Sequence, residues 1–474
     1  MIAKSNDRWS DIRDTSALQT QFTQAGLQPE QPRCRLWIQI AQSLLNHPRH
    51  LGQHSGGMVI AAGRLDKIVP IEPASMANRK VIQWDKDDCA YSGIIKVDLL
   101  GLGMLSALEQ AVPLIAQTEG KKIDLANIPP NDSNVFDLLC RADTVGVFQV
   151  ESRAQMATLP RLKPRTFYDL VIEIALIRPG PVSGNMVHPF LRRRAGTEPI
   201  SYPHPSLEKI LSKTLGVPIF QEQVMRMAMR AANFSGGEAE DLRRAMGFKR
   251  SNQKMHTLKQ KLRNGMSRNN IPKQSQNEII KSISSFANYG FPESHSASFA
   301  LLAYASAYLK TYHHGAFTCS LLNSWPLGFY SPDTLLKDAQ RHDIKILPLN
   351  IHHSEWNCTL QDKNTLRLGF RYAQSISQAS IQRLITERNQ SPFLSIKDFE
   401  RRCQLSNAEL ANLAELGAFE SFPSKHKAIT TRRQAMWSVA SLKERSQGLL
   451  ALAKEEIPNP ALKEMTLKER ISAD

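Results

Sequence analysis

The stretch IIKVDLLGLG, residues 94–103, carries two opposite charges, Lys96 and Asp98, inside a run that is otherwise aliphatic. An aliphatic run of this length, ended by glycines, predicts a β-strand. Residues two positions apart share one face of a strand, so the side chains of Lys96 and Asp98 should lie side by side. A buried strand would not carry these charges without a reason, and the pair has three interpretations.

The first interpretation is a surface ion pair on a half-exposed sheet, which contributes at most about 1 kcal/mol to stability. The second is a dinucleotide-binding fold, because Gly101-x-Gly103-x-x-Ser106 and a helical pattern follow the strand, with Asp124 about twenty residues on. Two features count against this fold. Its first strand is covered on both faces, which would bury both charges, and Pro113 should interrupt the helix.

The third interpretation is a phosphate and metal site, in which Asp98 is a metal ligand and Lys96 contacts a phosphate. Two-metal phosphoryl transfer uses carboxylates to hold Mg²⁺ and cations to neutralise a triphosphate. One carboxylate cannot hold two metals, so the pair would form only part of such a site.

The composition is that of an ordinary globular protein with room for about three domains: 474 residues, 42% hydrophobic and 22% charged. No apolar run approaches the ~18 residues that span a bilayer, and the first residues lack a signal-peptide pattern, so we expect a cytoplasmic protein with no membrane contact. The cysteines form no C-x-x-C pair and are expected to be reduced thiols. They are Cys34, Cys89, Cys140, Cys319, Cys358 and Cys403.

The net charge of +16 predicts a polyanionic partner, of which nucleic acid is the commonest. The basic residues are clustered, which favours a binding face over separate solvated helix surfaces. The clusters lie at 161–165, 191–196, 242–250 and 259–273.

Hydrophobic periodicity divides the chain into segments of different structure. Residues 33–51 form an amphipathic helical pattern, and 56–62 and 79–84 read as strands beside the opening stretch. From about 104 to 340 the pattern is mainly helical, with turns at Pro and Gly.

The remaining segments predict less regular structure. Between about 345 and 421, short strands should flank two helical patterns, at 375–389 and 406–419. Residues 422–474 have little that could form a core, and we expect a linker or tail there.

Seven motifs, in this order along the chain, closely resemble the palm and fingers of bacterial C-family DNA polymerases, the polymerase III alpha-like enzymes. They are LGQHSGGMVIA (51–61), VIQWDKDDCAYSGIIKVDLLGLGMLSAL (81–108), GVFQVESRAQM (146–156), IALIRPGPVSGNM (174–186), PIFQEQVMRMA (218–228), DLRRAMGFKR (241–250) and YGFPESHSASFALLAYASAYLK (289–310). Within that family the chain resembles the error-prone, damage-inducible branch. The segments that suggest this branch are QWDKDDCA, LLGLGMLSAL, TRRQAMW and EMTLKE.

The resemblance implies roles for individual residues. The third palm carboxylate of the family matches Asp98, which would be catalytic and would bind Mg²⁺, the implied cofactor. The neighbouring Lys96 would be catalytic and would contact the nucleotide.

The resemblance also implies nucleotide-binding residues outside this pair. The arginines of the fingers that contact the incoming nucleotide match Arg243 and Arg244, early in a helix. Gly56 and Gly57 match a turn where the backbone passes close to the site, although an ordinary tight turn would read the same way. Arg178 and His295 lie in family motifs without an assigned role.

The resemblance implies an α+β, mainly helical fold: part of a polymerase-beta-like palm sheet, a large helical fingers domain and a helix-hairpin-helix region. The implied domains are a thumb remnant at 1–53, the second part of the palm at 54–103, fingers at 104–345, tandem helix-hairpin-helix at 346–421 and a linker or tail at 422–474. The hairpin at 372–380 departs from the family pattern because it lacks the glycine, and this counts against a grip on DNA by that hairpin.

The implied function is error-prone DNA-directed DNA synthesis in DNA replication and repair after DNA damage, by two-metal nucleotidyl transfer. The partners would be primer–template DNA and dNTPs, with a sliding clamp or other mutagenesis proteins as further candidates. The family's upstream D-x-D strand, phosphoesterase-like domain and OB domain have no match here, so we expect a fragment that is inactive alone. The alternative is a non-catalytic, basic DNA-binding remnant, whose DNA affinity should fall steeply with salt.

Overall fold

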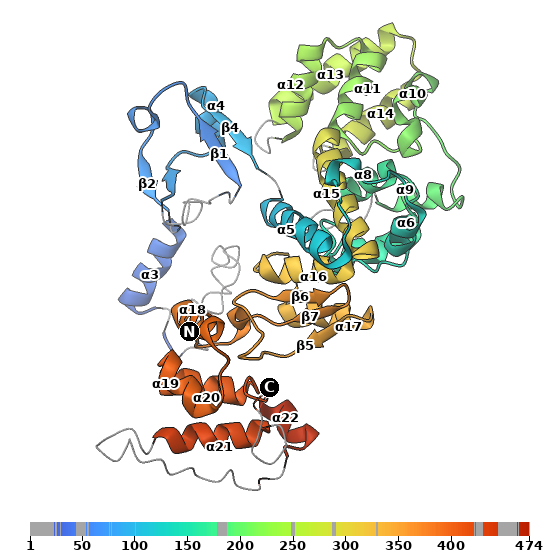
Figure 1. The fold of residues 1–474 in the computed structure, drawn as a ribbon. Coiled ribbons are helices and arrows are strands. Elements are labelled where there is room, and N and C mark those ends of the chain that lie inside the picture. Colours follow the sequence, from blue (N-terminus) through green and yellow to red (C-terminus); the bar gives the residue numbers. More distant parts are fainter. Residues whose placement is uncertain are drawn as a thin grey trace. The chain divides into compact units, whose positions relative to one another are not determined.

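The computed structural model describes residues 23, 26–28, 30–43, 54, 56–74, 76, 78–99, 101–177, 187–247, 252–286, 291–328, 330–420, 422, 430–443, 462 and 464–473. Within these ranges, the side chains at 41–42, 86–87, 187–188, 244–247, 252–255, 285–286, 443 and 471–473 lie outside the description. The chain divides into two compact units, Met1–Leu100 and Gly101–Asp474, and each is described by itself (Figure 1).

Among its described residues, the first unit contains two small antiparallel sheets, a 12-residue helix and a six-residue helix. Its elements are α3 (Pro32–Ser43), β1 (Gly57–Ile60), η2 (Leu65–Lys67), β2 (Ile71–Pro73), β3 (Lys80–Ile82), α4 (Lys86–Tyr91) and β4 (Ile95–Asp98). β1 pairs with β4, and β2 pairs with β3. The strands predicted around residues 56–62, 79–84 and 94–98 are therefore confirmed, as is the helix that begins near residue 33.

A small core holds the first unit together. Val69, Cys89 and Ile94 are buried, and Trp84 packs against them. Ile94 directly precedes β4, so its burial fixes which way the strand faces. The opposite face of the β1–β4 sheet carries exposed apolar side chains: Met58, Ile60, Ile95, Val97 and Leu99.

The second unit is mainly helical, which confirms the predicted fold class. Its helices as far as residue 341 are α5 (Leu102–Glu119), α6 (Ser133–Cys140), α7 (Arg153–Leu162), α8 (Phe167–Leu176), α9 (Val187–Arg194), α10 (Glu208–Leu211), α11 (Gln221–Ala232), α12 (Gly236–Gly247), α13 (Asn252–Arg268), α14 (Lys273–Phe286), α15 (Glu293–Tyr312), α16 (His314–Asn323) and α17 (Pro332–Arg341). Short 3-10 turns lie at Leu125–Asn127, Pro205–Leu207 and Ser212–Thr214. Pro113 lies inside α5, so our expectation that it interrupts this helix was wrong.

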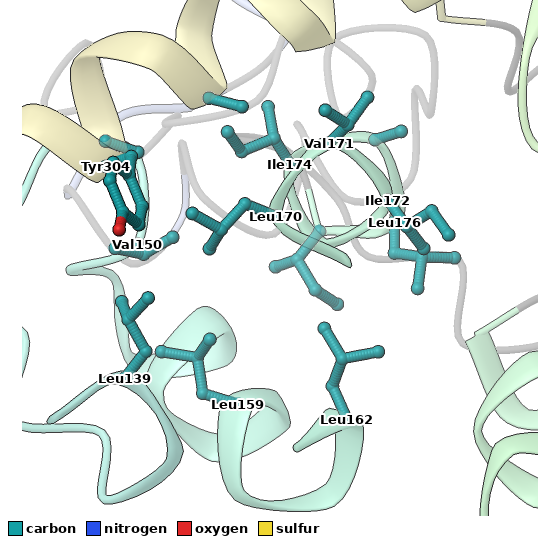
Figure 2. Close-up of a cluster of buried hydrophobic side chains, with 14 of the residues drawn as sticks. Leu139, Val150, Leu159, Leu162, Leu170, Val171, Ile172, Ile174, Leu176 and Tyr304 are labelled. Carbon is teal, nitrogen blue, oxygen red and sulfur yellow. The ribbon is translucent and has the colours of Figure 1, made fainter. Parts of the chain in front are cut away.

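Helix α8 is the centre of the largest core in the second unit. Its residues from 169 to 176 are all buried, because apolar side chains occupy every face of the helix. Figure 2 shows Leu170 and Ile174 of α8 among the side chains of Leu159 from α7 and Tyr304 from α15. Helix α15 therefore packs along α8, and these two helices form the centre of this part of the fold.

Glu173 is an ionisable residue in this core, and its carboxylate is fully buried on α8. Among the described residues, neither of its oxygens has a hydrogen-bond partner. Burial raises the pKa of Glu173 to about 8 from a reference value of 4.5. The folded chain therefore binds this proton more tightly than the unfolded chain, and its stability should fall as the pH rises from about 4.5 to about 8.

We expect Glu173→Met to remove this pH dependence and to raise the free energy of unfolding at pH 8 by about 2–3 kcal/mol. Urea unfolding at a series of pH values measures the effect. Glu109→Met on the exposed surface of α5 is the matched control and should leave the pH profile unchanged. An unaltered profile in Glu173→Met would contradict the prediction.

The C-terminal part of the second unit begins with a three-stranded sheet of order β5–β7–β6. Its elements are β5 (Lys345–Leu347), β6 (Thr359–Asp362), β7 (Thr365–Arg367), η6 (Phe370–Tyr372), α18 (Gln378–Gln390), α19 (Ile396–Cys403), α20 (Asn407–Glu415), α21 (Arg432–Lys443) and α22 (Leu467–Ala473). All three strands precede the helices rather than flank them, which corrects our expectation.

Three helices of this part, α19, α21 and α22, were not predicted. α19 has buried Ile396, Phe399 and Cys403 at helical spacing. α21 lies within the segment expected to be a linker or tail, but its Ala435 and Val439 are buried in the same core as α18–α20. The expectation that this segment contributes little to a core is therefore wrong for α21.

Ser375 has a left-handed backbone conformation, with a φ of 58°, in the turn that precedes α18. This conformation costs a residue with a Cβ about 1 kcal/mol or more, and glycine avoids the cost. Ser375 is exposed, so removing its side chain loses no packing. We expect Ser375→Gly to raise the free energy of unfolding by about 0.5 kcal/mol, after the larger entropy of the unfolded glycine chain is deducted. Urea unfolding measures this, and Ser375→Ala, which keeps the strain, should show no gain.

Candidate functional site

Lys96 and Asp98 lie on the same face of β4, as the strand pattern predicted. Lys96 Nζ donates a hydrogen bond to Asp98 Oδ1. The side chains are 28% and 42% exposed, respectively, so the pair is a surface ion pair within the first unit. His54 Nδ1 approaches Asp98 Oδ1 to 4.0 Å. The geometry is that of the first interpretation, a surface ion pair. Because the Asp98 side chain is 42% exposed, its carboxylate is also accessible to a ligand.

The β1–β4 pairing determines the surroundings of Asp98. Asp98 lies opposite Gly57 in the antiparallel register. A dinucleotide fold would require a central strand covered on both faces, whereas β4 belongs to a two-stranded sheet and is exposed. The second interpretation of the opening stretch is therefore excluded.

Gly56 is required by a close approach of two backbones. The Leu99 amide donates to the Gly56 carbonyl at 2.7 Å. A Cβ on Gly56 would lie 2.1 Å from the Leu99 oxygen, so any other residue would force the strands apart. Gly57 closes a turn in which its amide donates to the His54 carbonyl at 3.2 Å. Both glycines thus have a structural reason, and their role toward a nucleotide stays a prediction.

Arg243 lies in the second half of α12, not early in the helix as expected. Its guanidinium makes a two-point contact with Glu240, at 2.7 Å from Nε to Oε2 and 2.5 Å from Nη2 to Oε1. This contact raises the pKa of Arg243 above its usual value. Arg244 belongs to the same helix, but its side chain lies outside the described residues.

Sequence reasoning missed Glu240 and His54. The Glu-x-x-Arg spacing of Glu240 and Arg243 is the signal for a helical ion pair and could have been used. His54 offers no such signal, because a turn brings it toward Asp98. Arg243 lies in the second unit, so it is described apart from the residues around Asp98.

The basic cluster at 191–196 is largely committed to internal contacts. Arg192 and Arg193 both bind Glu198, and Arg194 binds Asp169 at 2.9 Å. Arg193 Nη1 also donates to the Leu215 carbonyl at 2.7 Å. This cluster therefore forms ion pairs within the fold, and its place in a basic binding face stays a prediction.

Other predicted features have structural explanations or fall outside the description. His295 stacks edge-on between Phe291 and Phe299, with ring centroids 5.0 and 4.4 Å away. Arg178 lies outside the described residues. All six cysteines are free thiols, as predicted.

His314, Asp338 and His342 form the one group among the described residues with the donor spacing of a metal site. The ammonium of Lys310 already occupies this position, at 2.8 Å from Asp338 and 3.2 Å from Asp143. His342 Nε2 contacts Asp143 at 2.7 Å. A divalent cation would have to displace a buried lysine, so the cluster is a structural charge network.

The pKa values of this network follow from its contacts. Burial alone would raise the pKa of Asp143 and Asp338, but Lys310 and the neighbouring histidines outweigh it and hold both below the usual range. Burial lowers the pKa of His314. The carboxylates therefore stay ionised inside the fold because a cation is built in beside them.

A carboxylate from α20, that of Glu409, lies at the start of α18. Glu409 accepts hydrogen bonds from the amides of Ser377, at 3.2 Å, and Ser406, at 2.9 Å. Burial alone would raise its pKa, but hydrogen bonds from Ser380, Ser406 and Ser377 lower it to about 2. A DNA phosphate would be repelled at this helix start, which agrees with the absence of the family's glycine from this hairpin.

No helix among the described residues is both long enough and apolar enough to span a membrane.

Three family models match the chain in order: the bacterial DNA polymerase III alpha NTPase domain at 1–101, the bacterial DNA polymerase III alpha subunit finger domain at 104–270, and the helix-hairpin-helix motif at 343–429.

Curated relatives cover nearly all of the chain. It is 47% identical over 447 residues to the error-prone DNA polymerase of Methylococcus capsulatus, covering 90% of this chain and 42% of that protein. The error-prone DNA polymerase of Pseudomonas aeruginosa is 45% identical over 447 residues, with 93% and 42% covered. That of Pseudomonas fluorescens is 44% identical over 488 residues, with 100% and 46% covered. The chain therefore spans less than half the length of these relatives.

Proposed function

Because this chain belongs to the bacterial DNA polymerase III alpha family, among its error-prone members, we propose that it forms part of a DNA-directed DNA polymerase. The enzyme would copy template DNA during repair and translesion synthesis by joining dNTPs to a primer. The observation that carries this proposal is the Lys96–Asp98 pair, which presents an accessible carboxylate and a cation on one face of β4.

The proposed reaction is attack of the primer 3′-hydroxyl on the α-phosphate of a dNTP, with pyrophosphate as the leaving group. Asp98 supplies one carboxylate to a divalent metal, which we propose to be Mg²⁺. Mg²⁺ accepts one or two carboxylates together with substrate phosphate oxygens, so a single accessible Asp98 fits as part of its ligand set. When bound, the metal would supply charge neutralisation at the phosphates.

The cationic side chains have the complementary task in this proposal. Lys96 contacts the triphosphate from the face of β4, as a point charge on a flexible stem. Arg243 and Arg244 bind phosphate oxygens from α12, since a guanidinium presents a planar fork that matches them. Gly56 and Gly57 keep the backbone turn beside Asp98 compact.

We assign 54–103 to the palm, 104–345 to the fingers and 346–421 to the helix-hairpin-helix region, with 1–53 as a thumb remnant. Primer–template DNA and dNTPs are the proposed substrates, and a sliding clamp or other mutagenesis proteins are the proposed partners. The Glu409 carboxylate of α20, which accepts a hydrogen bond from the Ser377 amide at the start of α18, counts against a DNA grip by that hairpin, and we propose that other parts of the region hold the DNA.

A chimera tests the proposal. In the Methylococcus capsulatus relative, the segment that matches this chain is replaced by this chain, and extension of a labelled primer is measured with Mg²⁺ and the four dNTPs. We expect template-directed extension by the chimera and none by the 474-residue chain alone. A folded, DNA-binding chimera that does not extend primers would refute the proposed function.

A further inference from the structure

The two-point contact between Arg243 and Glu240 has a geometry that a phosphate would also use. Both contacts run from one edge of the guanidinium, at 2.7 and 2.5 Å, to the two oxygens of one carboxylate. An arginine binds two phosphate oxygens through the same fork. The side chains are about one-third exposed, at 35% for Arg243 and 33% for Glu240, so a ligand from solvent can reach the pair.

A second carboxylate adds to the negative charge at this place. Glu222 of α11 lies close enough to act electrostatically on Arg243. Its Oε2 accepts a hydrogen bond from the Glu293 amide at 2.9 Å, which holds it at the start of α15. A nucleotide approaching Arg243 therefore meets two carboxylates, one of which already occupies the arginine fork.

We propose that Glu240 is a positioning residue that holds Arg243 ready and competes with the triphosphate of an incoming nucleotide for its guanidinium. The inference rests on the proposed role of Arg243 as a triphosphate contact. A polyanionic triphosphate can displace the carboxylate, whereas a nucleoside without phosphates cannot. Glu240 thus weakens nucleotide binding by an amount that depends on the phosphate charge.

The test is equilibrium dialysis of the full chain with labelled dATP and Mg²⁺ at low salt, compared with labelled deoxyadenosine. We expect Glu240→Gln to tighten dATP binding about threefold to fivefold, because exposed ion pairs contribute up to about 1 kcal/mol. Deoxyadenosine binding should not change. In an Arg243→Gln background the same substitution should have no further effect, as a double-mutant cycle requires when two residues act together.

Two control variants separate this role from a general effect of charge or helix stability. Glu238→Gln removes the same charge from the same helix, where Glu238 binds Lys261 instead, and should leave the Kd for dATP within about twofold. Glu240→Asp keeps the charge and should behave like the unsubstituted chain. Circular dichroism confirms that each variant is folded.

Failure of this inference can be distinguished from failure of the proposed function. If Arg243→Gln weakens dATP binding but Glu240→Gln leaves it unchanged or weaker, the competing role of Glu240 is refuted and the nucleotide contact stands. An equal gain in Glu238→Gln also refutes it. If Arg243→Gln does not weaken dATP binding, the nucleotide contact itself is wrong and the inference falls with it.

Discussion

Asp98→Asn is expected to lower the primer-extension rate of the chimera about a thousandfold, which corresponds to about 4 kcal/mol of transition-state stabilisation. The substitution keeps the shape of the side chain but removes the negative charge that would hold a metal ion. It also removes the carboxylate partner of Lys96. Single-turnover extension at saturating dNTP measures the change, since it reports the chemical step.

Asp66→Asn is the matched control for this prediction. Asp66 forms an ion pair with Arg64 two residues away, at 2.5 Å on the surface of the same unit, so it repeats the spacing of Lys96 and Asp98. Its substitution should change the rate by less than about twofold, as expected for an exposed pair. If Asp98→Asn retained a third or more of the extension rate, the metal-binding role of Asp98 would be refuted. The Lys96–Asp98 pair would then be a surface ion pair without a catalytic role.

Local patterns made the elements around Asp98 predictable from the sequence. The alternation of Lys96 and Asp98 with aliphatic residues predicted β4, and the Gly56–Gly57 pair predicted the turn before β1. Both depend on neighbours along the chain, which the sequence displays directly. The mainly helical pattern predicted from about 104 to 340 likewise includes α8, but the burial of α8 on all sides was not predicted.

Tertiary packing decided the elements that were missed. Pro113 stays within α5, although proline usually ends or kinks a helix. α21 packs because Ala435 and Val439 meet a core that α18–α20 provide, and its own sequence shows little of this. The ion pair of Glu240 with Arg243 could be predicted from their spacing of three residues on a helix. The approach of His54 to Asp98 could not, because it depends on a turn.

The charge network around Lys310 could not be read from the sequence, because its members come from distant segments. Lys310 lies on α15, Asp143 follows α6, and Asp338 lies on α17. Each is an ordinary charged residue in its own segment, and only the packed helices show that the ammonium is fully buried. The distances among the donor atoms of His314, Asp338 and His342 would suggest a metal site if Lys310 were not taken into account.

Lys310→Met is expected to lower the free energy of unfolding by about 3–5 kcal/mol, because it leaves two partly or fully buried carboxylates without their cation. Urea unfolding followed by circular dichroism measures the loss. Lys337→Met on α17 is the matched control. Lys337 binds Asp333 at 2.8 Å with both side chains exposed, so its loss should cost less than about 1 kcal/mol.

The pH dependence of this loss identifies its cause. In the folded chain, Asp143 and Asp338 have pKa values below the reference value of 3.8, so their contribution to stability is present above about pH 4 and is lost as the pH falls further. Removing Lys310 removes the attraction that lowers these pKa values. The difference in free energy of unfolding between the Lys310→Met variant and the unsubstituted chain should therefore become smaller as the pH falls below about 4. A difference that stays constant down to pH 3 would mean that Lys310 stabilises the fold through packing of its aliphatic stem, and not through its charge.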